Sequence, residues 1–178
     1  VCAPDGVAQE TFFRKQVPAH FPNWVQRVRV PLRSGGANTQ VVVTAPETLV
    51  YLASQACFAI HPWLSRTTHL ECPDRLIIDL DVAADDDFAT VKRVARLCRD
   101  RLKVAYLMLT GGTGLHIVAP IEPTHRFAAV RAVAKELCDA VAAAHPELAT
   151  TEIEKAKRGK RVFLDYLRNA YGQTTVAP

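Results

Sequence analysis

The chain has 178 residues, 49% of them hydrophobic, and its 22 basic and 18 acidic residues give a net charge of +4. This length corresponds to one domain at about 150 residues per domain, and the balanced composition excludes wholesale disorder. No apolar run reaches the ~20 residues of a membrane span, and the N-terminus lacks the pattern of a signal peptide. We therefore expect one cytoplasmic domain over residues 1–178 with no membrane contact.

The cysteine pattern indicates the redox compartment in which the protein is found. The cysteines are five in number, widely spread and without a Cys-x-x-Cys pair: Cys2, Cys57, Cys72, Cys98 and Cys138. This pattern excludes a disulfide framework or a zinc ribbon and favours a reducing compartment. The net positive charge fits a polyanionic partner, although many proteins carry such a charge for solubility alone.

The first third of the chain predicts two strands and a helix. Strands are expected over residues 25–30 and 40–44, on either side of the turn signal at 33–38. Thr44-Ala45-Pro46-Glu47 resembles a capping box with proline near the first turn, so a helix is expected over residues 46–58.

The remaining elements alternate strands with helices. The expected order is a strand at 76–82, a helix at 86–103 that begins in the Asp85–Asp87 cluster, strands at 105–110 and 115–119, a helix at 126–144 and a strand at 162–167. On the helix at 126–144, a core-facing stripe is expected at Val130, Val133, Leu137 and Val141. Strands interrupted by two clear helices predict an α+β fold with a mixed or antiparallel sheet.

Two aspartates in one apolar strand are the most informative feature. In Ile77-Ile78-Asp79-Leu80-Asp81, alternation puts Asp79 and Asp81 on the same face, roughly 7 Å apart along the strand. Two such carboxylates repel each other and are costly to desolvate, and a divalent cation resolves that conflict. The alternative is an edge strand whose polar face meets solvent.

A third carboxylate lies in another apolar segment, Val162 to Leu167. Aspartate is a poor strand residue, so Asp165 in a second hydrophobic strand is the pattern expected if both strands converge on one metal site. A solvent-facing position, or a salt bridge to a nearby arginine, would explain it equally simply.

The segment from Thr110 to His116 contains the glycines Gly111, Gly112 and Gly114. Glycines between strands allow backbone N–H groups to surround an anion, and Thr110 and His116 could donate to a phosphate. A strand follows the loop and no Gly-Lys-Ser/Thr is present, so this is not a Walker A loop. A plain hairpin turn with a core histidine is the alternative.

Smaller groups point toward nucleic acid. Phe12 and Phe13 precede Arg14 and Lys15, a combination that suits base stacking and phosphate contact, although adjacent phenylalanines are more often core residues. His61 lies in a short segment with Trp63 and Arg66. The basic stretch at residues 155–161 fits a polyanion groove or an ordinary solvated face.

Taken together and in this order, the segments resemble one family, the primase-polymerase domain of bacterial DNA ligase D in the archaeo-eukaryotic primase superfamily. The matching segments are Pro4–Gly6, Phe12–Lys15, Pro22–Val25, Ile60–Trp63, Asp74–Asp81, Gly111–His116, Lys155–Arg158, Phe163–Asn169 and Thr174–Pro178. The resemblance implies a primase-like fold and a template-dependent nucleotidyltransferase that extends primer ends with NTPs during double-strand break repair by non-homologous end joining.

The resemblance also assigns roles. It implies that Asp79, Asp81 and Asp165 hold two Mn²⁺ or Mg²⁺ ions. It implies nucleotide contacts from His61, Thr110, Gly111, Gly112, Gly114 and His116, and DNA contacts from Phe12, Phe13 and Lys15, with Lys15 on a 5′-phosphate. Expected partners are DNA ends, NTPs, a fused or separate ligase and the end-binding protein Ku, with a place at the bacterial nucleoid.

The chain departs from the family pattern at several points. Thr113 and Met108 stand where the family commonly has basic residues, and the family carries sequence on both sides of the matched stretch, so we expect a fragment incomplete at both ends. Two rival functions therefore stay open: a two-metal nuclease or phosphoesterase using the same carboxylates, and a catalytically weakened DNA-end-binding module.

Overall fold

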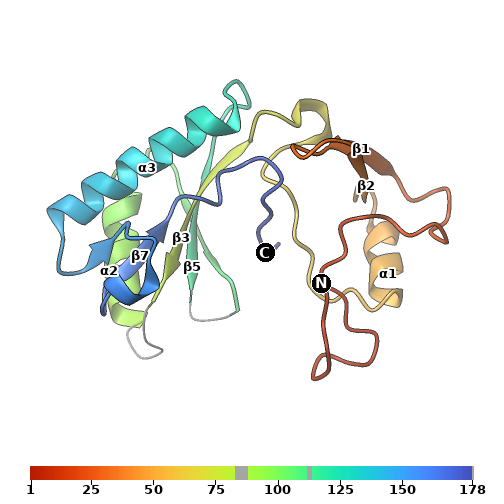
Figure 1. Cartoon of the computed structure of the whole chain (residues 1–178), viewed down its shortest axis with the longest axis horizontal. Helices are drawn as coiled ribbons and strands as arrows, with labels where there is room; N and C mark the ends of the chain where they lie inside the picture. Colours follow the sequence, from red (N-terminus) through yellow and green to blue (C-terminus); the bar gives the residue numbers. More distant parts are fainter. Residues whose placement is uncertain (83–87, 112–113, 178) are drawn as a thin grey trace. The chain divides into compact units, whose positions relative to one another are not determined.

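The structure is a computed structural model that describes residues 1–82, 88–111 and 114–177 (Figure 1). Its internal contacts define two compact units. The N-terminal unit comprises residues 1–62 with Ala177, and the sheet unit comprises residues 63–176. The single domain predicted from length thus contains two units, each with its own strands and apolar cluster.

The N-terminal unit contains a hairpin and one helix. Strands β1 (Arg27–Pro31) and β2 (Ala37–Val41) pair antiparallel on either side of a turn, as predicted. Strand β2 begins three residues earlier than expected, so residues 37 and 38 of the predicted turn belong to the strand. Helix α1 (Pro46–Ser54) has proline in its first turn, but Ala45 precedes it and no side chain caps it. The predicted capping box is therefore wrong, because the helix begins one residue too late for Thr44 to act as its cap. The helix also ends earlier than expected, at Ser54, and Ala56 then adopts a positive φ of 57°.

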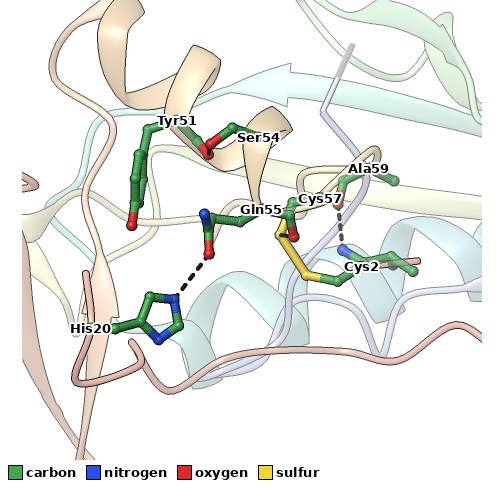
Figure 2. Close-up of a disulfide and its surroundings, with 8 residues drawn as sticks. Cys2, His20, Tyr51, Ser54, Gln55, Cys57 and Ala59 are labelled. Carbon is green, nitrogen blue, oxygen red and sulfur yellow. Dashed lines mark hydrogen bonds between the residues drawn. A yellow bond between two sulfur atoms is a disulfide. The ribbon is translucent and has the colours of Figure 1, made fainter. Parts of the chain in front are cut away.

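A disulfide between Cys2 and Cys57 closes the N-terminal unit (Figure 2). Cys2 also exchanges main-chain hydrogen bonds with Phe12, and the ammonium group of Val1 donates to the Ala59 carbonyl at 2.5 Å. The cysteine pattern predicted no disulfide framework, and nothing local in the sequence indicates this pair, because its two members lie 55 residues apart. Cys72, Cys98 and Cys138 are free thiols.

The sheet unit is built on five strands in the order β4-β5-β3-β7-β6. Their bounds are β3 (Arg75–Asp81), β4 (Tyr106–Leu109), β5 (Leu115–Pro120), β6 (Ala149–Thr150) and β7 (Val162–Asp165). Neighbouring strands are antiparallel except β6 and β7, which are parallel. The predicted mixed sheet is confirmed. Strand β6 was missed because two residues show no periodicity.

Helices α2 (Phe88–Arg99) and α3 (Phe127–Ala144) pack against the sheet (Figure 1). They share one apolar cluster with Leu76, Ile78 and Leu80 of β3, so they cover the face of the sheet to which these side chains point. The predicted start of the first of these helices, at Asp85–Asp87, lies outside the described residues. Within the described ranges, no helix combines the length and the apolar character needed to cross a membrane.

The α3 stripe needs one correction. Val130, Ala134, Cys138 and Val141 are buried, whereas Val133 is 56% exposed. From Val130 the buried positions are spaced by four, four and three residues, so Val133 falls on the flank of the stripe and Leu137 is only partly buried against it. Two short 3₁₀ turns complete the unit, at Thr67–His69 and Lys155–Lys157.

Candidate active site

Four residues form one row across the sheet. Asp79 of β3 stands directly opposite His116 of β5 on one side and Asp165 of β7 on the other, and His116 stands opposite Met108 of β4. Strand alternation places this row on the face opposite the apolar side chains that pack against α2 and α3. The predicted convergence of Asp79 and Asp165 is therefore a direct consequence of strand register.

Asp79 is the most enclosed of the three carboxylates, with its side chain 6% exposed. His116 Nε2 lies 3.3 Å from its Oδ1, and Arg168 Nε donates to its Oδ2 at 3.1 Å. Burial alone would raise the pKa of Asp79, but the contacts with His116 and Arg168 outweigh burial and hold that pKa below its ordinary value. Asp79 is therefore the carboxylate of the three that stays ionised to the lowest pH.

Asp81 and Asp165 respond in the opposite direction. Burial, followed by the negative charges of Asp79 and Asp165, raises the pKa of Asp81. The pKa of Asp165 is also raised, first by burial and further by Asp79, although the Leu167 N–H donates to its Oδ1 at 2.7 Å. The three carboxylates are thus close enough to repel one another, as the sequence pattern predicted.

Gly114 lies close to two of these carboxylates. A Cβ built on Gly114 would lie 3.5 Å from Asp81 Oδ1, 3.7 Å from Asp79 Oδ1 and 3.2 Å from the Leu80 carbonyl. The oxygens of Asp79 and Asp81 therefore converge on one point, and a residue without a side chain leaves that point accessible.

Other residues of the loop shape its turn. Thr110 Oγ1 donates to the Gly114 carbonyl at 3.2 Å, and Gly111 has a φ of 83°. The Thr110 hydroxyl thus closes the turn in this structure. The predicted nucleotide contact Gly112 and its neighbour Thr113 lie outside the described residues.

His116 has one nitrogen with an unused hydrogen-bonding capacity. Its side chain is 7% exposed. Nε2 faces Asp79, and Nδ1 is buried without a hydrogen-bond partner among the residues that the structure describes. A buried polar atom of this kind is normally satisfied, so Nδ1 marks a place where a ligand group could be received.

The chemistry of the three carboxylates fits a divalent cation, because hard oxygen ligands suit Mg²⁺ and Mn²⁺. Their arrangement in this structure does not yet form such a site. Across residues 1–82, 88–111 and 114–177, no three His, Cys, Asp or Glu side chains are placed to hold a metal ion together. One reason is visible at Asp79, whose two oxygens already face His116 and Arg168.

The predicted DNA contacts lie in the N-terminal unit and are described within it. Phe12 is 39% exposed and Phe13 59% exposed, and Lys15 is also exposed. The Arg14 guanidinium carbon lies 5.0 Å from the Phe12 ring centre. Phe13 packs edge to face with His61, with ring centres 4.8 Å apart. Phe13, predicted to stack on a base, and His61, predicted to contact the nucleotide, are therefore in direct contact.

Two arginines act on the carboxylates: Arg168 was not predicted as a site residue, and Arg158 was expected only as part of the basic stretch at residues 155–161. Arg168 contacts Asp79 and lies 3.6 Å from Asp165 Oδ2. Arg158 lies over the Phe163 ring, 3.6 Å from its centre, and its charge offsets a small part of the rise in the pKa values of Asp81 and Asp165. The sequence held a signal for Arg168, which follows Asp165 by three residues, but only as a general salt-bridge alternative.

Comparisons with known proteins identify the family of this chain. The family model described as "LigD, primase-polymerase domain" matches residues 1–178. The multifunctional non-homologous end joining DNA repair protein LigD of Mycobacterium tuberculosis is 30% identical over 187 residues, which cover 98% of this chain and 24% of the relative. LigD of Pseudomonas aeruginosa is 30% identical over 185 residues, covering 99% of this chain and 21% of the relative.

A solved structure shows the same fold. It is described as the polymerase domain from Mycobacterium tuberculosis Ligase D in complex with DNA, and it matches with a TM-score of 0.91 and 28% identity. The match covers 99% of this chain and 66% of the solved chain. The chain spans about a quarter of the length of the curated relatives. With the family model matched over residues 1–178, this chain belongs to the LigD primase-polymerase domain family.

Proposed function

We propose that this chain is a template-dependent nucleotidyltransferase that extends DNA primer ends with NTPs during double-strand break repair. The observation that carries the proposal is the convergence of Asp79 and Asp81 on Gly114, with Asp165 directly opposite Asp79. Membership of the LigD family supports a role in end joining.

The three carboxylates would hold the metal ions of the reaction. Asp79, Asp81 and Asp165 would bind two divalent ions, Mn²⁺ or Mg²⁺, through oxygen ligands. When bound, such ions activate a primer 3′-hydroxyl and neutralise the charge of the leaving pyrophosphate. Burial first, and the charge of Asp79 second, raise the pKa values of Asp81 and Asp165, and a bound cation would relieve the repulsion among the three carboxylates.

The glycine-rich loop would receive the incoming nucleotide. Thr110, Gly111, Gly112 and Gly114 would surround the triphosphate with backbone N–H groups, because glycines permit close approach. His116 would hold Asp79 through Nε2 and offer Nδ1 to the nucleotide. His61 would contact the nucleotide as well.

The N-terminal unit would bind DNA. Its exposed Phe12 and Phe13 suit stacking on bases, and Lys15 suits a 5′-phosphate. The solved polymerase domain that this chain resembles was captured in complex with DNA. A ligase domain, fused or separate, and the end-binding protein Ku would be partners in repair.

A primer-extension assay tests the proposal. The chain is incubated with Mn²⁺, labelled UTP and a primer-template with a recessed 5′-phosphate, and extension is expected with the native chain and not with Asp165→Asn. Primer shortening without extension would favour the nuclease alternative. Binding of the recessed end without any incorporation would favour the end-binding module.

A glycine variant gives the assay a second arm. In Gly114→Ala, the new methyl group would meet the Leu80 carbonyl at 3.2 Å and the Asp81 and Asp79 oxygens. Extension should therefore fall at least tenfold, equivalent to about 1.4 kcal/mol, while the circular dichroism spectrum is retained. Gly172→Ala is a control for backbone strain away from the carboxylates: a Cβ there meets nothing within 4 Å, but its φ of 79° disfavours alanine, so this variant should lower stability and leave extension unchanged.

A further inference from the structure

Arg168 occupies a particular position at the carboxylates. Its Nε is 3.1 Å from Asp79 Oδ2 and 3.6 Å from Asp165 Oδ2, so one guanidinium lies against two of the three proposed metal ligands. The side chain of Arg168 is 41% exposed, whereas those of Asp79 and Asp165 are only 6% and 14% exposed. The cation thus reaches the carboxylates from the solvent side.

We propose that Arg168 is an internal counter-cation that blocks the metal position and must leave Asp79 Oδ2 before a divalent ion can take that oxygen. The inference rests on the proposed function, since it concerns the same carboxylates. Arg168 is in this sense a positioning residue, which acts on metal entry through Asp79 and Asp165.

The charges explain why a cation is needed there. A buried carboxylate without compensation is strongly destabilising, and Asp79 is repelled further by Asp81 and Asp165. A guanidinium stays protonated at any ordinary pH, so it cannot be removed by titration. Exchange against another cation vacates the oxygen without leaving Asp79 with His116 as its one remaining partner in the described part of the site.

The local structure allows the side chain alone to make this exchange. The next residue, Asn169, is fully buried and fixed by three hydrogen bonds: its Oδ1 accepts from the Ile77 N–H, and its Nδ2 donates to the carbonyls of Ile77 and Tyr166. The backbone beside Arg168 is therefore anchored to β3. The long, half-exposed arginine side chain can swing toward solvent while Asp79 stays in place.

Manganese binding and metal-free stability together test the inference. Mn²⁺ is titrated into the native chain, Arg168→Gln, Arg168→Lys and Arg99→Gln, and free Mn²⁺ is followed by electron paramagnetic resonance. Arg168→Gln should bind Mn²⁺ about tenfold more tightly, equivalent to about 1.4 kcal/mol, because it no longer competes for Asp79. Its metal-free melting temperature should fall, because Asp79 loses its counter-cation.

The controls separate this role from a structural one. A merely structural arginine would lower both stability and Mn²⁺ affinity when replaced, whereas the inference requires the two to change in opposite directions. Arg168→Lys keeps the charge and should stay near the native affinity. Arg99→Gln removes a charge at the last residue of α2, which is paired with Asp100, and should leave the affinity unchanged.

The outcomes also distinguish the two proposals. If the native chain binds Mn²⁺ and Arg168→Gln binds it equally or more weakly, the Arg168 inference is wrong and the proposed function stands. If neither protein binds Mn²⁺, both the metal site and the inference are overturned. Binding that appears only in Arg168→Gln would support the inference most directly.

Discussion

The two units position their candidate residues in different ways. In the sheet unit, Asp79, Asp165 and His116 lie on hydrogen-bonded strands, and register alone places them in one row. In the N-terminal unit, Phe12 and Phe13 lie before the first strand, in a segment that is tied by the Cys2–Cys57 disulfide and the bridge between Cys2 and Phe12. The positions of residues on paired strands follow from the register of the sheet. Residues in an irregular segment are held in place by individual disulfides and hydrogen bonds.

The largest effect on stability is expected from removing the Cys2–Cys57 disulfide of the N-terminal unit. Cys57→Ser opens a loop with a sequence separation of 55 residues, which should lower stability by about 4 kcal/mol through the entropy of the unfolded chain. Hydrogen exchange should accelerate in residues 1–62 and stay unchanged in β3, β5 and β7. Cys72→Ser, at a free thiol, is the control, and unchanged exchange in residues 1–62 would contradict the prediction.

The second largest effect tests the anchoring of the sheet unit. Asn169→Ala removes three hydrogen bonds and leaves the N–H and C=O groups of Ile77 with one partner fewer. Stability should fall by about 3 kcal/mol, measured by urea unfolding. Gln173→Ala, at an exposed position in the same segment, should change it by less than about 0.5 kcal/mol. If the two variants change stability equally, the hydrogen bonds of Asn169 do not anchor the sheet unit.

Replacing the two carboxylates of β3 should change the stability of the metal-free protein in opposite directions. Asp79→Ala removes the partner of His116 and Arg168 and should lower stability by about 2 kcal/mol. Asp81→Asn relieves repulsion from Asp79 and Asp165 and should raise stability by about 0.5 kcal/mol. The two melting temperatures should therefore move in opposite directions, and a fall in both would contradict the assigned electrostatics.

The pH dependence of these variants follows from their pKa directions. The raised pKa of Asp81 means that the folded state binds its proton more readily, so native stability declines as pH rises from about 4 through that pKa. The gain from Asp81→Asn should therefore be present at neutral pH and vanish toward pH 4. For Asp79, with its lowered pKa, the stabilising effect is present at neutral pH and is lost as pH falls through that pKa.

Sequence periodicity accounts for the part of the site that was predicted correctly. Strand alternation placed Asp79 and Asp81 on one face, and the same pattern around Asp165 identified its strand. The contacts that periodicity cannot reach were missed. Arg168 and Asn169 contact β3 from about 90 residues away, and Cys57 reaches Cys2 across 55 residues. Such pairings depend on the assembled fold, because nothing local in the sequence specifies them.

The smallest expected effect concerns Lys15 in the N-terminal unit. A lysine on a DNA phosphate releases about one counterion on binding, so Lys15→Ala should lower the salt slope of end binding by about one unit. Lys103→Ala, at an exposed lysine between α2 and β4, should leave the slope unchanged. Binding should be measured by fluorescence anisotropy on recessed ends with and without a 5′-phosphate. If Lys15 contacts that phosphate, its replacement should matter only on the phosphorylated end; an equal loss on both ends would assign it to general backbone attraction.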